Sequence, residues 1–143
     1  MGNQNKTKEE LQNELKRLQN EHNALQALYN KESKERSLIA TQQIKSETFS
    51  RMLFEQSSIG LALTSMDGKF TDVNQAFANI IGRTIEETLQ LSYWDITPVK
   101  YAEQEQQQLE SLNLTGTYGP YEKEYIHKNG QLIPVRLQGS IIE

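Results

Sequence analysis

Residues 59–74 read IGLALTSMDGKFTDVN, and this segment fixes the architecture of the chain. Two β-rich segments, 59–66 and 69–73, flank Asp67-Gly68, a pair that favours the left-handed dihedral angles of a tight hairpin turn. The side chain of Asn74 can accept a backbone N–H two or three residues on, which is typical of a helix N-cap. The segment therefore predicts an antiparallel hairpin that leads directly into a helix.

Toward the C-terminus, several helical segments follow the hairpin. Apolar residues at 76, 77, 80 and 81 predict a helix of about two turns, which Gly82 ends. Residues 84–87 have the form of a capping box, with Thr84 as the cap and Glu87 reaching back. Thr97-Pro98 predicts a cap followed by proline at the first position of a helix that runs to Leu112, with residues 103–108 on its exposed face.

A second hairpin completes this part of the sequence. Residues 121–128 lead to Asn129-Gly130, a pair that suits a turn with positive φ at both central residues. The return strand alternates, with apolar residues at 133, 135, 137 and 141 on one face. Pro134 is expected at a strand flank, where no N–H donor is required. The order of hairpin, helices and hairpin predicts an α+β fold, with an antiparallel sheet covered by helices on one face.

The N-terminal part is predicted to be a long helix, because no glycine or proline occurs between Asn3 and Ile59. Apolar residues spaced alternately by four and three, interrupted by His22, are typical of a coiled-coil seam. We expect a helical stalk at 1–45, a domain at 46–143 that begins with a short amphipathic helix, and a hinge at 56–58. The alternative is a solvated helix in a monomer. The seam predicts a homodimer through Leu11, Leu15, Leu18, Leu25 and Tyr29.

Composition excludes several classes of protein. The 143 residues contain no cysteine, which excludes disulfide frameworks, zinc–thiolate clusters, iron–sulfur sites and thiolate nucleophiles. A net charge of -4 offers no footprint for nucleic acid or an anionic membrane. No apolar run is long enough to cross a bilayer, so we expect a cytoplasmic chain. His22 and His127 lie far apart and no glycine-rich phosphate loop occurs, so we predict no catalytic residues and no metal site.

Five groups of motifs occur in order: FEQSSIGLAL (54–63), MDGKF (66–70), VNQAF with IGR (73–83), WDITP (94–98), and KNG with PV (128–135). Together they cover about residues 47–143 and resemble the PAS (S-box) sensory domain of bacterial signal-transduction proteins. The resemblance implies a small cavity between the inner face of the sheet and the helices. Members of the family hold haem, flavin or small metabolites there, or leave the cavity empty and dimerise.

The resemblance also implies which side chains line that cavity, although each can equally be plain core. No cysteine follows Thr84, which disfavours a cysteinyl-flavin, and no histidine occurs in 98–112, which disfavours haem. A non-covalent flavin or a small metabolite stays open, because Trp94 could stack on a ring and Asn74 could hydrogen-bond it; the alternative is Trp94 as a core plug and Asn74 as a cap. No polar pair is evident near the candidates, which are Leu61, Leu63, Asn74, Phe77, Ile81, Leu89, Tyr93, Trp94, Ile126, Val135 and Leu137.

The resemblance further implies a function and an incomplete sheet. We expect a non-catalytic sensory and dimerisation module, the input part of a two-component histidine kinase; the alternatives are the input of a cyclic-dinucleotide enzyme or a ligand-free dimerisation domain. The family's sheet has five strands, and the last lies between the first and the fourth. Because the sequence to Glu143 accounts for four, we expect a fragment of a longer protein whose sheet is gapped there or completed by another segment.

Overall fold

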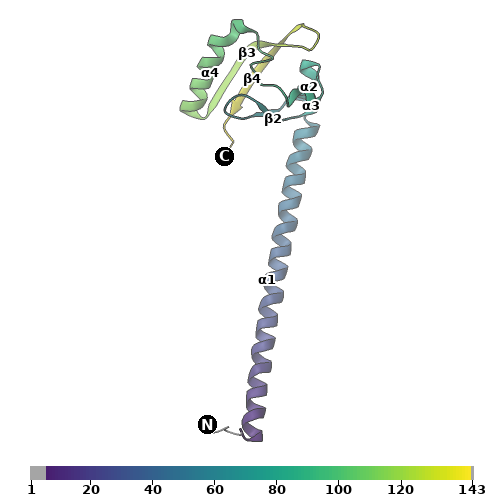
Figure 1. Cartoon of the computed structure of the whole chain (residues 1–143), viewed down its shortest axis with the longest axis vertical. Helices are drawn as coiled ribbons and strands as arrows, with labels where there is room; N and C mark the ends of the chain where they lie inside the picture. The colour runs from purple at the N-terminus through teal and green to yellow at the C-terminus, as the bar shows by residue number, and fades with distance from the viewer. Residues whose placement is uncertain (1–5, 143) are drawn as a thin grey trace. The chain divides into compact units, whose positions relative to one another are not determined.

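The computed structural model describes residues 6–142, so residues 1–5 of the predicted stalk and residue 143 of the predicted domain lie outside the described residues. The chain forms two compact units that divide between Ser50 and Arg51. No helix of the described part is long and apolar enough to cross a bilayer. In chain order (Figure 1), the elements are α1 (Lys8–Gln56), β1 (Ala62–Thr64), β2 (Phe70–Val73), α2 (Gln75–Ile81), α3 (Ile85–Thr88), the 3-10 helix η1 (Val99–Tyr101), α4 (Ala102–Thr115), β3 (Thr117–Ile126) and β4 (Leu132–Ser140).

The helix α1 is continuous over 49 residues, so the expectation of a separate short helix from Ser46 is wrong. Without glycine or proline, no residue in this segment favours a break. At its start, the Thr7 hydroxyl accepts the Glu10 backbone N–H (3.2 Å) and the Glu10 carboxylate accepts the Thr7 N–H (2.7 Å). This reciprocal capping satisfies donors that the first turn leaves free.

The first hairpin is confirmed, but β1 is shorter than expected. Gly68 takes φ 87°, and its N–H donates to the Ser65 carbonyl at 2.9 Å, which closes the turn between β1 and β2. The pairing is antiparallel, with Leu63 opposite Asp72 and a register shift between Leu63 and Thr64. Residues 59–61 do not join the strand, because the carbonyl of Ile59 and the N–H of Leu61 bond the Asn74 side chain instead.

The helices are capped largely as predicted. Gly82 ends α2 at φ 67°, and the capping box of Thr84 and Glu87 opens α3. The predicted Thr97 cap is wrong: a 3-10 turn precedes α4, and no side chain caps either element. The Thr97 hydroxyl donates to the Tyr93 carbonyl at 2.7 Å, which draws it away from the helix start.

The second hairpin is also confirmed, but the expected positive φ at both central residues of its turn is wrong, because Gly130 takes φ 87° whereas Asn129 has no positive φ. β3 and β4 pair antiparallel around the turn at Asn129-Gly130, with Tyr125 opposite Ile133, and α4 packs along β3 (Figure 1). Pro134 lies within β4 rather than at its flank. β4 has no neighbour on its other edge among the described residues, and a residue without an N–H is tolerated on such an edge. β1–β2 and β3–β4 thus form two separate two-stranded sheets, as a gap between the first and fourth strands requires.

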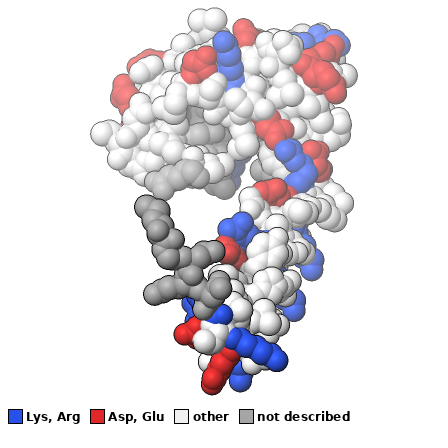
Figure 2. All heavy atoms as spheres, turned by 60° about the horizontal axis from the view of Figure 1, so that its bottom comes forward, with Lys and Arg blue, Asp and Glu red and all other residues white. Residues whose placement is uncertain are grey.

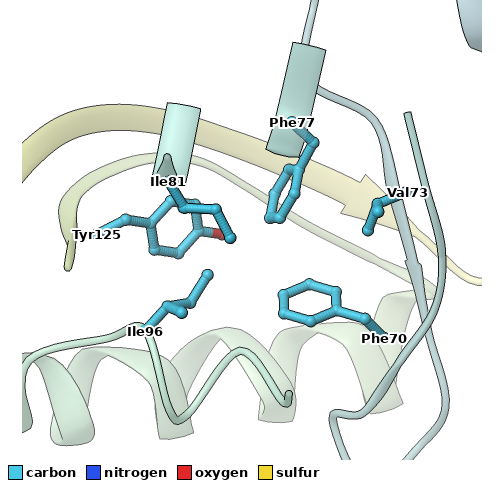
Figure 3. Close-up of a cluster of buried hydrophobic side chains, with 6 residues drawn as sticks. All are labelled: Phe70, Val73, Phe77, Ile81, Ile96 and Tyr125. Carbon is cyan, nitrogen blue, oxygen red and sulfur yellow. The ribbon is translucent and has the colours of Figure 1, made fainter. Parts of the chain in front are cut away.

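The core of the second unit is small and draws on both hairpins. Phe70 and Phe77 pack with ring centroids 5.2 Å apart, and Phe77 meets Tyr125 edge-on at 5.9 Å. Trp94, expected as a possible core plug, is 40% exposed and packs over the Gly68 turn. The buried position is taken by Ile96, two residues later. Figure 3 shows the cluster, which consists of Phe70, Val73, Phe77, Ile81, Ile96 and Tyr125.

The fully buried side chain of Asn74 uses its whole hydrogen-bonding capacity. Its Oδ1 accepts the N–H of Phe77, which is the predicted cap, and the N–H of Leu61, both at 2.9 Å. Its Nδ2 donates to the carbonyls of Phe54 at 3.0 Å and Ile59 at 2.9 Å. One amide therefore joins the end of α1, the segment before β1 and the first turn of α2.

Asn74→Ala is expected to lower the free energy of unfolding by about 3 kcal/mol, because it removes four hydrogen bonds and leaves buried backbone groups without partners. Asn74→Asp should cost at least as much, because its second carboxylate oxygen would face the carbonyl oxygens of Phe54 and Ile59 at a fully buried position. Urea denaturation of the intact chain, followed by a signal from the second unit, measures the free energy of unfolding of both variants. The exposed Asn79→Ala is the matched control and should change the value by less than about 0.5 kcal/mol. Equal losses for Asn74→Ala and Asn79→Ala would contradict the role given to Asn74.

Candidate functional site

A buried lysine lies between β3 and α4. The side chain of Lys123 is 1% exposed, and its Nζ lies 2.6 Å from Oε1 of Glu105, whose side chain is 5% exposed. Nζ also donates to the Thr97 hydroxyl at 3.0 Å. A buried charge needs both a counter-charge and hydrogen bonds to offset its desolvation, and this ammonium has both.

Strand alternation explains why Lys123 points inward. Along β3, Lys123 and Tyr125 are buried, whereas Glu122 is exposed and Glu124 is half-buried beside Lys100 on the surface. Among the described residues of α4, Glu105 is the one that is buried. The expectation that residues 103–108 form an exposed face is therefore wrong at Glu105, because this position of the helix faces β3.

Tyrosine side chains surround the ammonium of Lys123. The ring centroids of Tyr93, Tyr121 and Tyr125 lie 5.7, 5.8 and 4.9 Å from Nζ, within the range of cation–π attraction. The Tyr121 hydroxyl donates to Glu105 Oε1 at 2.6 Å. Tyr118 packs edge-on against Tyr121, with centroids 6.0 Å apart. We call Thr97, Glu105, Lys123 and these four tyrosines the Lys123 cluster.

The environment changes the acid–base properties of the Lys123 cluster. Burial lowers the pKa of Lys123, and the hydrogen bond and charge of Glu105 oppose that change. Burial, followed by the Glu105 charge, raises the pKa of Tyr93 to about 12 and also raises the pKa of Tyr118. The pKa values of Tyr121 and Tyr125 are raised as well, with burial as the largest cause. The phenols therefore stay protonated at neutral pH and can donate hydrogen bonds.

The eleven residues predicted to line a cavity do not share one environment. Phe77 and Ile81 lie in the core, and Asn74 is fully engaged, so a bond from its amide to a flavin ring would require one of its four bonds to break. Leu89, Tyr93, Val135 and Leu137 pack around the core, and Ile126 is half-buried. The three others are 37–40% exposed: Leu61, Leu63 and Trp94. A shared lining role for the set stays a prediction.

Sequence reasoning missed most of the Lys123 cluster. Only Tyr93 was among the candidates, and no converging polar pair was expected. A signal was present, since Tyr121, Lys123 and Tyr125 occupy alternate positions and so share one face of a strand. Nothing local, however, indicates that Glu105 faces them from 18 residues away. Within residues 6–142, no group of three His, Cys, Asp or Glu side chains comes together to hold a metal ion.

Glu105→Gln is expected to lower the free energy of unfolding by about 3–5 kcal/mol, because it leaves the Lys123 ammonium buried without a counter-charge. Lys123→Met should be destabilising by a similar mechanism. The double variant removes both charges and should lose clearly less than the sum of the two single losses. Chemical denaturation of the four proteins gives the coupling.

Lys128→Met is the matched control, since Lys128 pairs with Glu87 at an exposed site and its loss should change stability far less. If the two single effects simply added, the charges of Lys123 and Glu105 would not be coupled as described. The same conclusion would follow if a single variant lost its fold in circular dichroism and the double variant did not recover it.

Comparison with known proteins finds relatives of this chain among signalling proteins. The chain is 31% identical over 100 residues to a probable diguanylate cyclase, DgcE, of Escherichia coli (strain K12), which covers 68% of this chain and 9% of that protein. It is 29% identical over 99 residues to the hybrid signal transduction protein dokA of Dictyostelium discoideum, covering 68% and 6%. The matched part is thus a small fraction of the length of these relatives.

The fold and the family follow from two further matches. A domain of a sensory box sensor histidine kinase/response regulator from Geobacter sulfurreducens superposes with a TM-score of 0.58 at 22% identity, over 68% of this chain and 84% of that one. The α+β fold predicted from the order of the elements, with the PAS-like architecture that the resemblance implies, is therefore confirmed. The model of the PAS domain family matches residues 58–143, more than half of the chain. The chain therefore belongs to the PAS domain family, whose members are sensory modules of signal-transduction proteins.

Proposed function

We propose that this chain is the cytoplasmic input part of a two-component histidine kinase. It perceives a small ligand, a non-covalent flavin or a partner, and passes the change through α1 without catalysing a reaction itself. A second candidate is the input of a cyclic-dinucleotide enzyme, supported by the 31% identity to a probable diguanylate cyclase. In the full-length protein, stimulus-dependent autophosphorylation supports the first output, and stimulus-dependent synthesis of a cyclic dinucleotide supports the second.

The observation that carries the proposal is a continuous set of contacts from the Lys123 cluster to α1. The Tyr125 ring contacts Phe77 edge-on, and the backbone N–H of Phe77 donates to Asn74. Asn74 in turn donates to the Phe54 carbonyl near the end of α1. A shift of Tyr125 can therefore reach α1 through two intermediate residues. A bias on the order of 1–3 kcal/mol between two packings is enough for such coupling.

A second contact fastens α1 to the first hairpin. Arg51 pairs with Asp72 of β2 at 2.9 Å and lies 3.7 Å from Glu55 of its own helix. Surface ion pairs contribute little stability, so this one can break and re-form without unfolding the domain. It is therefore a suitable element for a reversible change at the end of α1.

The N-terminal helix supports pairing of two copies. In the single chain, its predicted seam residues are 49–70% exposed, which leaves a row of large apolar side chains in water. Burying such a row against a second helix supplies the driving force for a coiled-coil homodimer. On the face that Figure 2 shows, acidic and basic side chains are interspersed rather than gathered by sign, which does not favour nucleic acid as the partner. The proposed seam consists of Leu11, Leu15, Leu18, Leu25 and Tyr29.

Replacing both Leu15 and Leu18 by Asp is expected to convert the dimer to a monomer in analytical ultracentrifugation, because charged side chains at seam positions cannot be buried without a partner. The near-ultraviolet circular dichroism of the domain should not change. Asn13→Asp and Lys16→Asp, combined, are the matched control on other positions of the same helix segment. A dimer that persists in the Leu15/Leu18 variant would move the interface elsewhere.

The sensory role is tested with the intact chain. The absorption spectrum of the purified protein reports a bound flavin or haem, and thermal shifts across a metabolite panel report other ligands. A ligand that raises the melting temperature should also change amide hydrogen exchange at residues 51–56, because Asn74 connects them to the core. If bound ligands leave exchange at 51–56 unchanged, the transmission part of the proposal is wrong.

A further inference from the structure

One polar side chain interrupts the proposed seam of α1. His22 lies between Leu18 and Leu25, with the same four- and three-residue spacing as the other seam residues. All three side chains are exposed in the single chain. A polar residue inside an apolar seam lowers the stability of a coiled coil and specifies how its helices align. His22 therefore bears on both the alignment and the strength of the proposed homodimer.

Charges beside the seam favour a parallel arrangement of the two helices. In the heptad register of the seam, Glu14 and Glu21 occupy one flank, and Gln19 and Gln26 occupy the other. In a parallel pair, each flank meets the opposite flank of the second copy, so glutamate lies beside glutamine. In an antiparallel pair that overlaps over the whole seam, like flanks meet, and the two Glu21 carboxylates would face and repel each other. The second copy therefore fits best in the parallel orientation.

A parallel, in-register pair places the two His22 side chains in one layer. Equivalent seam positions meet in such a dimer, so leucine layers at positions 18 and 25 enclose the histidine layer. Two neutral imidazoles can share a hydrogen bond, because each has one donor and one acceptor nitrogen. Two imidazoliums have only donors and carry like charges, and histidine is the side chain that changes charge between about pH 5 and 8. The layer therefore permits pairing when it is neutral and opposes pairing when it is charged.

The other charges near this layer are balanced within each helix. Among its described residues α1 contains no buried side chain, so the groups that face His22 are those of the second copy. The nearest is Glu21, whose carboxylate lies 2.8 Å from Arg17 of its own helix, with both side chains more than half exposed. Because water and Arg17 weaken the field of that carboxylate, it attracts an imidazolium less than two imidazoliums in the seam repel each other. Protonation of the layer therefore weakens the pair.

We infer that α1 pairs with a second copy in parallel and in register, and that the His22 layer makes this pairing depend on pH. The two separate helices bind protons at His22 more readily than the dimer does, so acidification shifts the equilibrium toward the monomer. The stalk thereby responds to pH independently of any ligand of the domain. This inference rests on the homodimer of the proposed function and names its orientation and its regulation.

Sedimentation equilibrium of the intact chain at about pH 8 and about pH 5.5 tests the pH dependence. The dissociation constant of the wild-type dimer should rise at least about tenfold at the lower pH. His22→Asn keeps a polar but uncharged side chain in the seam and should remove this rise. His22→Lys is charged at both pH values and should give a weak dimer at both. His127→Gln replaces the other histidine of the chain, and as the matched control it should keep the rise.

A single introduced cysteine reports the orientation, because the chain contains no other cysteine. Leu11→Cys should form an interchain disulfide on mild oxidation, since a parallel, in-register pair brings the two copies of position 11 together. In an antiparallel pair that overlaps over the whole seam, position 11 lies opposite position 29, and the two cysteines would be about 27 Å apart along the helix axis. Asn13→Cys, on the outward face of the same turn, is the matched control and should stay largely unlinked.

The outcomes separate this inference from the proposed function. A dimer of equal strength at both pH values, a tighter dimer at the lower pH, or a dimer without a disulfide at position 11 would each overturn the inference and leave the proposed homodimer in place. A pH dependence that persists in His22→Asn or disappears in His127→Gln would place the effect elsewhere and also overturn it. A wild-type chain that is monomeric at both pH values would overturn the proposed homodimer and the inference together.

Discussion

The buried amide of Asn74 is the constraint on which the rest of the second unit depends. It has two donors and two acceptor positions, and all four are matched to backbone groups, which belong to the end of α1, the segment before β1 and the first turn of α2. These backbone groups lie outside any regular ladder, so without Asn74 they would need water in a buried place. A residue with only an acceptor, such as Asp, or only one polar atom, such as Ser, cannot replace it. The start of β1, the first turn of α2 and the end of α1 are therefore positioned by one side chain.

The second unit is held together without one continuous sheet. β1–β2 and β3–β4 form separate sheets, and two backbone hydrogen bonds join the second hairpin to the helical section: Ile126 N–H to Ile96 at 2.7 Å, and Lys128 N–H to Ile81 at 2.9 Å. The buried connections between them are the apolar cluster and the Lys123–Glu105 pair, which joins α4 to β3, and surface contacts such as Lys128–Glu87 and Tyr101–Glu124 add to these. A buried ion pair stabilises little on balance, because desolvation offsets most of the attraction. Its main effect here is to fix which residues of α4 and β3 face each other.

The parts of the fold that could be predicted from the sequence are those set by local chemistry. Asp67-Gly68, Asn129-Gly130, Gly82 and the Thr84–Glu87 capping box each act within four residues, and each lies at its predicted position, although only the glycines of the two turns take a positive φ. The errors at Thr97, Trp94 and Glu105 share a different cause. Trp94 packs over the Gly68 turn, and Glu105 faces Lys123. The Thr97 hydroxyl accepts a hydrogen bond from the Lys123 ammonium as well as donating one to Tyr93. Contacts with distant residues therefore decide how these side chains are used. The site was missed for the same reason: its charged pair joins residues 18 apart, on a helix and a strand.

The planarity of the Asn74 amide bears on the proposed transmission from the core to α1. Its Oδ1 and Nδ2 are held in one rigid plane, so a rotation of the amide that follows the Phe77 N–H also tilts both Nδ2 bonds. Hydrogen bonds weaken steeply with angle, and a buried donor has no water to replace a lost partner. In the proposed transmission, the amide would therefore favour discrete arrangements over gradual deformation, which is the property that a two-state element requires. Phe77 also packs against Tyr125. In the proposed transmission, any change in the position of the Tyr125 ring would therefore act on Phe77, whose N–H bonds the Asn74 amide.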